Sequence, residues 1–190
     1  MSLEVLFIGI SDAFPKAGEE TACFLINRQI LVDTGWNVAV NMLSYDVSPT
    51  DVDHVLCTHC HIDHMLGLPG LLAANRKRAS VRSNAPPMRF YGPRDLAAAC
   101  EASTAMLQVD RLPPTIPEYE VHYATPGETV SIGEISVQVG RAFHSVDARC
   151  YRFDDSASGA SVVFTGDTAY HEGLAAFAKG YDVLIHDACA

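Results

Sequence analysis

The stretch His59-Cys60-His61-Ile62-Asp63-His64 gathers three imidazoles and one carboxylate in a single short segment. It follows the β-rich run 52–58, so we expect it to leave the end of a strand. Side chains two residues apart on extended backbone point to the same side, so His59 and His61 could hold one ion. We expect a helix to begin near Asp63 and to turn Asp63 and His64 toward the same pocket. Imidazole and carboxylate are zinc ligands, so the stretch predicts a metal centre, and its many donors favour two adjacent ions.

Two later residues are candidate partners for this stretch. His144 follows the apolar run 135–143, and Asp167 follows another apolar run that ends at Phe164. A lone histidine at a strand end, or an aspartate after a glycine, is more often a structural residue. They become candidate ligands because the first stretch needs partners and both follow strand ends.

These motifs, taken in order, resemble those of the metallo-β-lactamase superfamily. The carriers are His59–His64, His144, Thr165-Gly166-Asp167-Thr168 and the opening segment Leu31-Val32-Asp33-Thr34-Gly35. The stretches His64–Leu72, Tyr91-Gly92-Pro93 and Leu184–Ala188 are most similar to the branch containing the tRNA 3′-processing endonuclease, tRNase Z. The resemblance implies an α+β fold, an αββα sandwich of two mixed sheets flanked by helices. Residues 1–190 would form one domain, with the metals at one edge.

The resemblance also implies a set of metal ligands. It assigns His59, His61 and His144 to one ion and Asp63 and His64 to a second, with Asp167 bridging the two. Up to two zinc ions are expected, with manganese or iron as alternatives. Two cations lower the pKa of a shared water and so supply a metal-bound hydroxide as the nucleophile.

Three further roles come from the same resemblance. Asp33 is the expected carboxylate that orients a metal-binding histidine, although an ordinary turn aspartate before Gly35 is the alternative. His186 would assist the leaving group as an acid or hydrogen-bond donor, with a structural strand-end histidine as the alternative. The third role is that of Asp63, which is an expected catalytic residue together with His186.

The chain departs from the tRNase Z pattern in two places. The tRNA-processing enzymes carry a long arm between the positions of His144 and Asp167, and the segment 146–160 is too short to form it. The net charge of −10 also opposes binding to a nucleic-acid backbone, so tRNA is not the expected substrate. The family pattern closes with another histidine beyond the last strand, and the sequence stops at Ala190 without one. Either the chain lacks its C-terminal end, or another group completes the site, or the second ion binds weakly.

The expected activity is metal-dependent hydrolysis of phosphodiesters or related small anionic esters. A lactone or thioester hydrolase of the same fold is one alternative, and a metal-binding domain without turnover is another. A flavodiiron-type redox role is disfavoured because His61 stands where that group usually has glutamate. The basic stretch 76–82 could attract an anionic substrate or could be a solvated loop within the expected loop 76–87.

The remaining expectations concern the domain size, the cellular compartment and the partners of the protein. The chain has 190 residues, of which 48% are hydrophobic and 19% charged, which is typical of one globular domain. It has no apolar stretch long enough to cross a bilayer, and its first residues do not form a signal peptide. Its six cysteines lie mostly in apolar runs, so we expect buried thiols and a cytoplasmic protein without membrane partners. A homodimer is left open.

Overall fold

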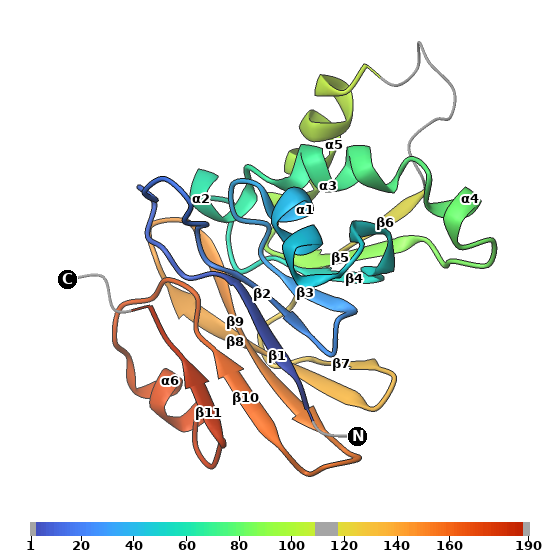
Figure 1. Cartoon of the computed structure of the whole chain (residues 1–190). Coiled ribbons are helices and arrows are strands. Elements are labelled where there is room, and N and C mark those ends of the chain that lie inside the picture. Colours follow the sequence, from blue (N-terminus) through green and yellow to red (C-terminus); the bar gives the residue numbers. More distant parts are fainter. Residues whose placement is uncertain (1–2, 109–117, 188–190) are drawn as a thin grey trace.

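The computed structural model describes residues 3–108 and 118–187 of the chain. Two β-sheets face each other, and most of the helices cover the outer face of the first sheet (Figure 1). The first sheet has the strand order β1-β2-β3-β4-β5-β6, antiparallel from β1 to β3 and parallel from β3 to β6. Its strands are β1 (Val5–Gly9), β2 (Cys23–Ile26), β3 (Ile30–Val32), β4 (His54–Leu56), β5 (Met88–Gly92) and β6 (Tyr119–Tyr123).

The second sheet has the order β11-β10-β9-β8-β7 and is antiparallel except for the parallel pair β10 and β11. Its strands are β7 (Thr129–Ile132), β8 (Ile135–Phe143), β9 (Asp147–Asp155), β10 (Ser161–Phe164) and β11 (Val183–Ile185). The helices are α1 (Val38–Asn41), η1 (Met42–Tyr45), η2 (Pro49–Asp51), α2 (Ile62–Met65), α3 (Leu68–Asn75), α4 (Arg78–Val81), α5 (Leu96–Met106) and α6 (Glu172–Phe177).

Strand β2 shows how one sheet serves two apolar cores. Its side chains are all buried, and successive side chains of a strand point to opposite faces. Phe24 and Ile26 belong to the core between the two sheets, where Phe24 meets Phe164 edge to face at 4.5 Å between ring centroids. Cys23 and Leu25 belong to the core beneath the helices, which a continuously apolar strand makes possible.

The ends of several strands meet at one edge of the sandwich. Because β3 and β4 are parallel, their carboxyl ends lie side by side, and the chain continues there into Asp33 and into Thr58. The two sheets are joined at this edge, since the Arg149 amide donates to the Thr58 carbonyl at 2.8 Å and the Tyr151 hydroxyl to the Cys57 carbonyl at 2.7 Å. Polar side chains that follow these strands are therefore brought together.

The expected α+β sandwich of two mixed sheets flanked by helices is confirmed. Two local predictions were wrong. The strand β7 was not anticipated, although its residues alternate between exposed and partly buried, and the expected loop 76–87 contains the short helix α4.

Within the described ranges, no helix is long and apolar enough to cross a membrane. The cysteines in the same ranges are free, and all of them except the half-buried Cys60 are buried.

Arg78 of the basic stretch has a structural position that neither expectation for the stretch foresaw. Its side chain is buried, and its guanidinium donates to the carbonyls of Thr50 and Val52 at 2.7 Å each and pairs with Asp53. Arg82 also pairs with Asp53, at 2.9 Å. Burial alone would raise the pKa of Asp53, but hydrogen bonds and charges from Arg82 and Arg78 outweigh it and lower that pKa. The arginines thus hold α4 against the segment that precedes β4.

We predict that Asp53→Asn lowers the free energy of unfolding by about 3 kcal/mol at pH 7, because it leaves the buried Arg78 charge without its carboxylate. Because the pKa of Asp53 is lowered on folding, this contribution is present above about pH 3.9 and is lost as the pH falls through the folded-state pKa. Urea titrations should therefore show a gap between wild type and variant that narrows below about pH 4. Glu4→Gln, which breaks the exposed pair with Arg28, is the control and should unfold like wild type. A gap that does not change with pH would contradict this account.

Candidate metal centre

The stretch His59–His64 leaves β4 and enters α2 at the shared edge of the two sheets. His61 is the N-cap of α2 and keeps extended backbone, with φ −71° and ψ 155°. The helix then turns Asp63 and His64 back toward His59, in agreement with the expected helix start. His59 and His64 are buried, whereas His61 is partly exposed. The stretch therefore contributes two buried imidazoles, those of His59 and His64, and one partly exposed imidazole, that of His61.

Three imidazoles converge in a first group. The Nδ1 atom of His61 lies 3.1 Å from His59 Nε2 and 2.9 Å from His144 Nε2. Ligand nitrogens about 2.0–2.1 Å from a tetrahedral zinc ion lie about 3.3 Å apart, so this spacing suits one ion. His144 reaches the group from the second sheet, directly after β8. The structure thus brings together the three residues expected on one ion.

A second group combines His59, His64 and Asp167, whose ligand atoms all lie within 4.8 Å of one another. One oxygen of Asp167 lies 3.4 Å from His64 Nε2, and the other lies 3.8 Å from His59 Nε2 and 3.9 Å from His144 Nε2. Asp63 approaches the same His64 nitrogen at 3.5 Å. Asp167 therefore faces both groups, as a bridging ligand must.

Asp33 supports the centre from below. Its carboxylate is fully buried and accepts hydrogen bonds from His64 Nδ1 at 2.8 Å and from the amide and hydroxyl of Thr58 at 2.7 Å each. The backbone of Asp33 is left-handed, with φ 55°, a conformation that aspartate tolerates better than most residues. With Nδ1 engaged, Nε2 of His64 is the nitrogen that faces Asp63 and Asp167. Asp33 thus fixes both the orientation and the binding atom of this imidazole.

The charges around the two buried histidines differ in their effect. Burial lowers the pKa of His64, but the carboxylates of Asp33 and Asp167 outweigh it and raise the pKa to about 10. Burial and the positive charge of His64 lower the pKa of His59 to about 3, against the opposing effect of Asp167. The lowered pKa favours the neutral imidazole of His59, and the free electron pair of that form is what binds metal. The carboxylates around His64 make its position favourable for positive charge.

A further set of buried residues holds the backbone of α2, and the sequence analysis did not identify these residues. The Thr21 hydroxyl donates to the Asp63 carbonyl at 2.6 Å, and the Thr34 amide donates to the His64 carbonyl at 2.8 Å. Gly67 lies so close to Thr34 that an added Cβ would stand 2.3 Å from its carbonyl oxygen. These contacts join segments far apart in the chain, so no local spacing could mark them.

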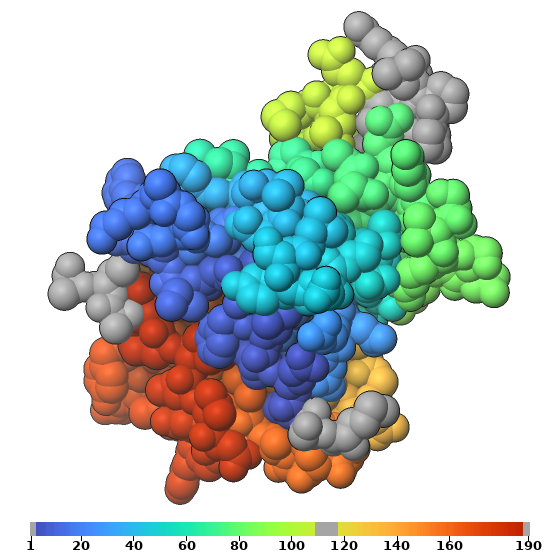
Figure 2. Space-filling model, viewed as in Figure 1, coloured from blue at the N-terminus to red at the C-terminus, as the bar shows by residue number. Residues whose placement is uncertain are grey.

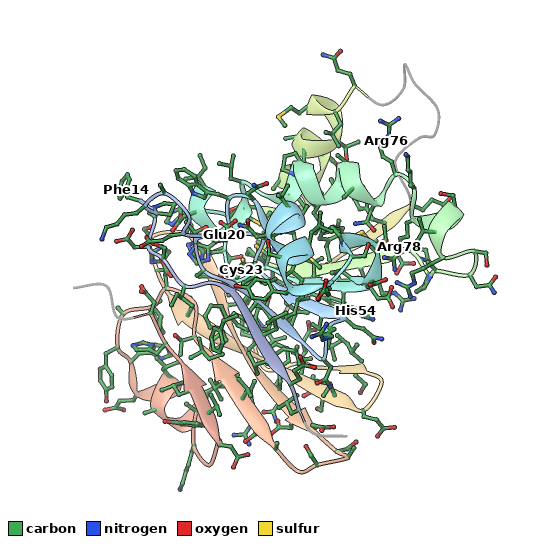
Figure 3. The ribbon with its side chains drawn as sticks, in the orientation of Figure 1. Phe14, Glu20, Cys23, His54, Arg76 and Arg78 are labelled. Carbon is green, nitrogen blue, oxygen red and sulfur yellow. The ribbon has the colours of Figure 1, made fainter. Side chains whose placement is uncertain are left out.

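Glu20, next to Thr21, makes more side-chain hydrogen bonds than the residues just described. Its buried carboxylate accepts hydrogen bonds from the amides of Thr21, Trp36 and Asn37 and from the side chain of Asn41, at 2.5–2.9 Å. Figure 3 shows Glu20 inside the molecule, close to α1. It connects the loop after β1 with the turn after β3, and so fixes Thr21 beneath Asp63.

His186 lies on the wall of a cavity of about 660 Å³ that also reaches Asp63, His64 and Asp167. Its Nδ1 atom lies 2.8 Å from the Thr165 hydroxyl. The expected catalytic histidine is thus beside the centre. The expectation of a missing ligand concerns the end of the chain, where residues 188–190 lie outside the described part.

Cys57 and Cys60 have the spacing C-x-x-C within the stretch that carries the first ligands. Both are free thiols, and the Cys57 thiol donates to the His59 carbonyl at 3.0 Å and to Met65 Sδ at 3.1 Å. Neither belongs to the two groups of converging ligand atoms. Cys57 therefore supports the backbone of His59 from the helix side.

Comparison with known proteins shows the family of the chain. Residues 28–190 match the family described as the beta-lactamase superfamily domain. Ribonuclease BN of Cronobacter sakazakii is 28% identical over 161 residues, which are 80% of this chain and 50% of that protein. Ribonuclease Z of Mycolicibacterium gilvum is 29% identical over 195 residues, which are 97% of this chain and 68% of that protein. The chain thus spans between half and about two thirds of these two relatives.

Among solved structures, the metallo-beta-lactamase fold protein YhfI of Bacillus subtilis has the same fold. It superposes with a TM-score of 0.75 at 24% sequence identity, covering 96% of this chain and 70% of that one. The family match covers most of the chain, and the sandwich agrees with it. The chain belongs to the metallo-β-lactamase superfamily, near its ribonuclease Z branch.

Proposed function

We propose that the chain is a metal-dependent hydrolase that uses two zinc ions to cleave phosphodiesters or related small anionic esters. The observation that carries the proposal is the position of Asp167, whose two oxygens face histidines of both ligand groups. A carboxylate between two clusters of imidazoles has the chemistry of a bridging ligand for two cations.

Each ion would be held by residues from both sheets. His59, His61 and His144 would hold the first ion, Asp63 and His64 would hold the second, and Asp167 would belong to both. Their nitrogen and carboxylate oxygen donors suit zinc, with manganese or iron as alternatives. When bound, the ions supply Lewis acidity and lower the pKa of a coordinated water.

The other residues of the site orient these ligands and handle protons. Asp33 holds His64 through Nδ1 and leaves Nε2 for the ion. The Thr165 hydroxyl donates to the Gly166 carbonyl, so Nδ1–H of His186 donates to Thr165 and Nε2 is left for a substrate in the cavity. As an imidazolium, His186 would donate a hydrogen bond or a proton from Nε2 to the leaving oxygen. Asp63 completes the polar end of the same cavity.

The names of the relatives favour phosphodiesters over acyl substrates, because two of them are called ribonucleases. Lactone and thioester hydrolysis, and metal binding without turnover, are the competing outcomes of the tests below. Hydrolysis of a 4-nitrophenyl phosphodiester by zinc-loaded protein, faster than that of a matched lactone or thioester, supports the proposal. Faster cleavage of the lactone or thioester, or zinc binding without cleavage of any ester, would refute it.

We predict that Asp167→Ala lowers kcat/KM for bis(4-nitrophenyl) phosphate by at least about 100-fold, equivalent to about 2.7 kcal/mol of transition-state stabilisation. The fold should survive, because Asp167 is partly exposed and its contacts are with the candidate ligands. Elemental analysis should show less zinc per chain than in wild type. Asp154→Ala, which removes an aspartate of the second sheet outside the site, is the control. Activity of Asp167→Ala within about tenfold of wild type would exclude a bridging role.

We also predict a graded loss in Asp33→Asn. An amide can still bond to Thr58, but it removes the negative charge that faces His64 Nδ1. Loss of such a supporting carboxylate typically costs about 10–100-fold in metal affinity or activity. Zinc titration with a competing chelator measures the affinity, and circular dichroism checks the fold. An unchanged zinc affinity would mean that Asp33 has only a structural role.

A third prediction concerns RNA. Strands β9 and β10 are joined by the short turn 156–160, so the second sheet has no protruding arm at this point, and the net charge is −10. We expect cleavage of small phosphodiesters but little cleavage of precursor tRNA, because repulsion from the acidic surface is not offset by an arm. Gel assays with a precursor tRNA at low and at physiological salt measure this. Efficient, site-specific removal of the 3′ trailer would overturn the expectation.

A further inference from the structure

The cavity beside the candidate metal centre has walls of two kinds. One end is polar and consists of Asp63, His64, Asp167 and His186. The rest is lined by segments from both ends of the described chain, and the space-filling view shows the N-terminal segment in blue directly beside the C-terminal segment in red (Figure 2). A molecule that reacts at the polar end and is too large for it would extend along the other wall.

Most of that other wall is apolar. Its inner part is made by Phe7, Phe24, Phe164 and Ile185. At the mouth stand Ile10 and Phe14, which are 81% and 86% exposed. Figure 3 shows Phe14 on the loop after β1, on the opposite side of the molecule from Arg76 and Arg78. Large apolar side chains held at the mouth of a cavity are typical of a binding surface.

The loop that carries these two side chains is well bonded, so their exposure is built into the fold. The Ser11 amide donates to the Glu20 carbonyl at 2.9 Å, and the Ser11 hydroxyl donates to the Glu19 carboxylate at 2.9 Å. The Phe14 amide donates to the Asp12 carboxylate at 2.8 Å. A large apolar side chain in contact with water is unfavourable relative to its burial, so a ligand that covers Phe14 gains affinity by removing its ring from water.

The charges of the cavity limit what it can accept. Among its described lining residues there is no lysine or arginine, whereas Asp12 adds negative charge to that of Asp63 and Asp167. Two divalent ions would offset the charge of the carboxylates that hold them. Each further negative charge on a ligand would face Asp12 with no lysine or arginine in the described lining to offset it, which is unfavourable. The cavity thus favours a singly charged anion over a multiply charged one.

We propose that the preferred substrate is a phosphate diester, a monoanion, that carries a flat uncharged aromatic group, and that Ile10 and Phe14 contact this group. The inference rests on the proposed hydrolysis of phosphodiesters and names the class of diester. The phosphate lies at the polar end, and the aromatic group covers the apolar wall. Aromatic groups gain both area burial and ring contacts against such a wall.

The test uses two inert diesters and therefore does not depend on turnover. Calorimetric titration of zinc-loaded protein with diphenyl phosphate and with dimethyl phosphate should give a Kd at least about tenfold lower for the diphenyl ester. The double variant Ile10→Ala/Phe14→Ala should reduce this ratio to less than about threefold. Both side chains are exposed, so the variant should fold normally. Tyr170→Ala, which removes an aromatic side chain that is 82% exposed and does not line the cavity, should keep the ratio of wild type.

The possible results separate this inference from the proposed function. Equal affinity of wild type for the two diesters, or a ratio that the double variant retains, overturns the aromatic subsite even if phosphodiesters are hydrolysed. A double variant that changes a dimer into a monomer in sedimentation, with the ratio intact, shows that Ile10 and Phe14 contact a second copy, which also overturns it. Phenyl phosphate, a dianion, should bind more weakly than diphenyl phosphate, and tighter binding would refute the charge argument.

Discussion

The hydrogen-bonded carboxylate of Asp33 is the contact on which the candidate centre depends. It lies directly after β3, is closed off from solvent, and binds both Thr58, which follows β4, and the imidazole of His64. A buried carboxylate is costly unless several donors satisfy it, and Thr58 and His64 together do so. The same three groups fix the exit of β4, the turn into α2 and the direction of one ligand. One set of hydrogen bonds therefore determines both the local path of the backbone and the orientation of a candidate ligand.

Much of the fold could be predicted because its patterns are local. The apolar run before His59 and the spacing of the histidines are readable from neighbouring residues, and the resemblance supplied the order in which distant motifs meet. The structure brings His144 and Asp167 to the first stretch. The short strand β7 was missed because it has only four residues, of which alternate ones are partly buried, and so short a run gives a weak apolar signal.

The remaining features could not be predicted because they depend on tertiary contacts. Glu20 resembles any other acidic residue of a loop until the turn at Trp36 is placed beside it. Arg78 belongs to a run that reads as a basic surface, and only the fold shows its guanidinium buried against Thr50 and Val52. In both residues the charge is used to satisfy backbone groups, and sequence gives no information about which backbone groups will be near.

The origin of the ligands has a consequence for the mechanics of the sandwich. His59, His61 and His64 come from the first sheet, whereas His144 and Asp167 come from the second. A cation held between them would act as a cross-link between two layers that otherwise touch mainly through apolar side chains and a few hydrogen bonds. By thermodynamic linkage, its binding free energy would then add to the cohesion of the layers. Removal of the ion would therefore loosen one sheet against the other as well as remove the chemistry.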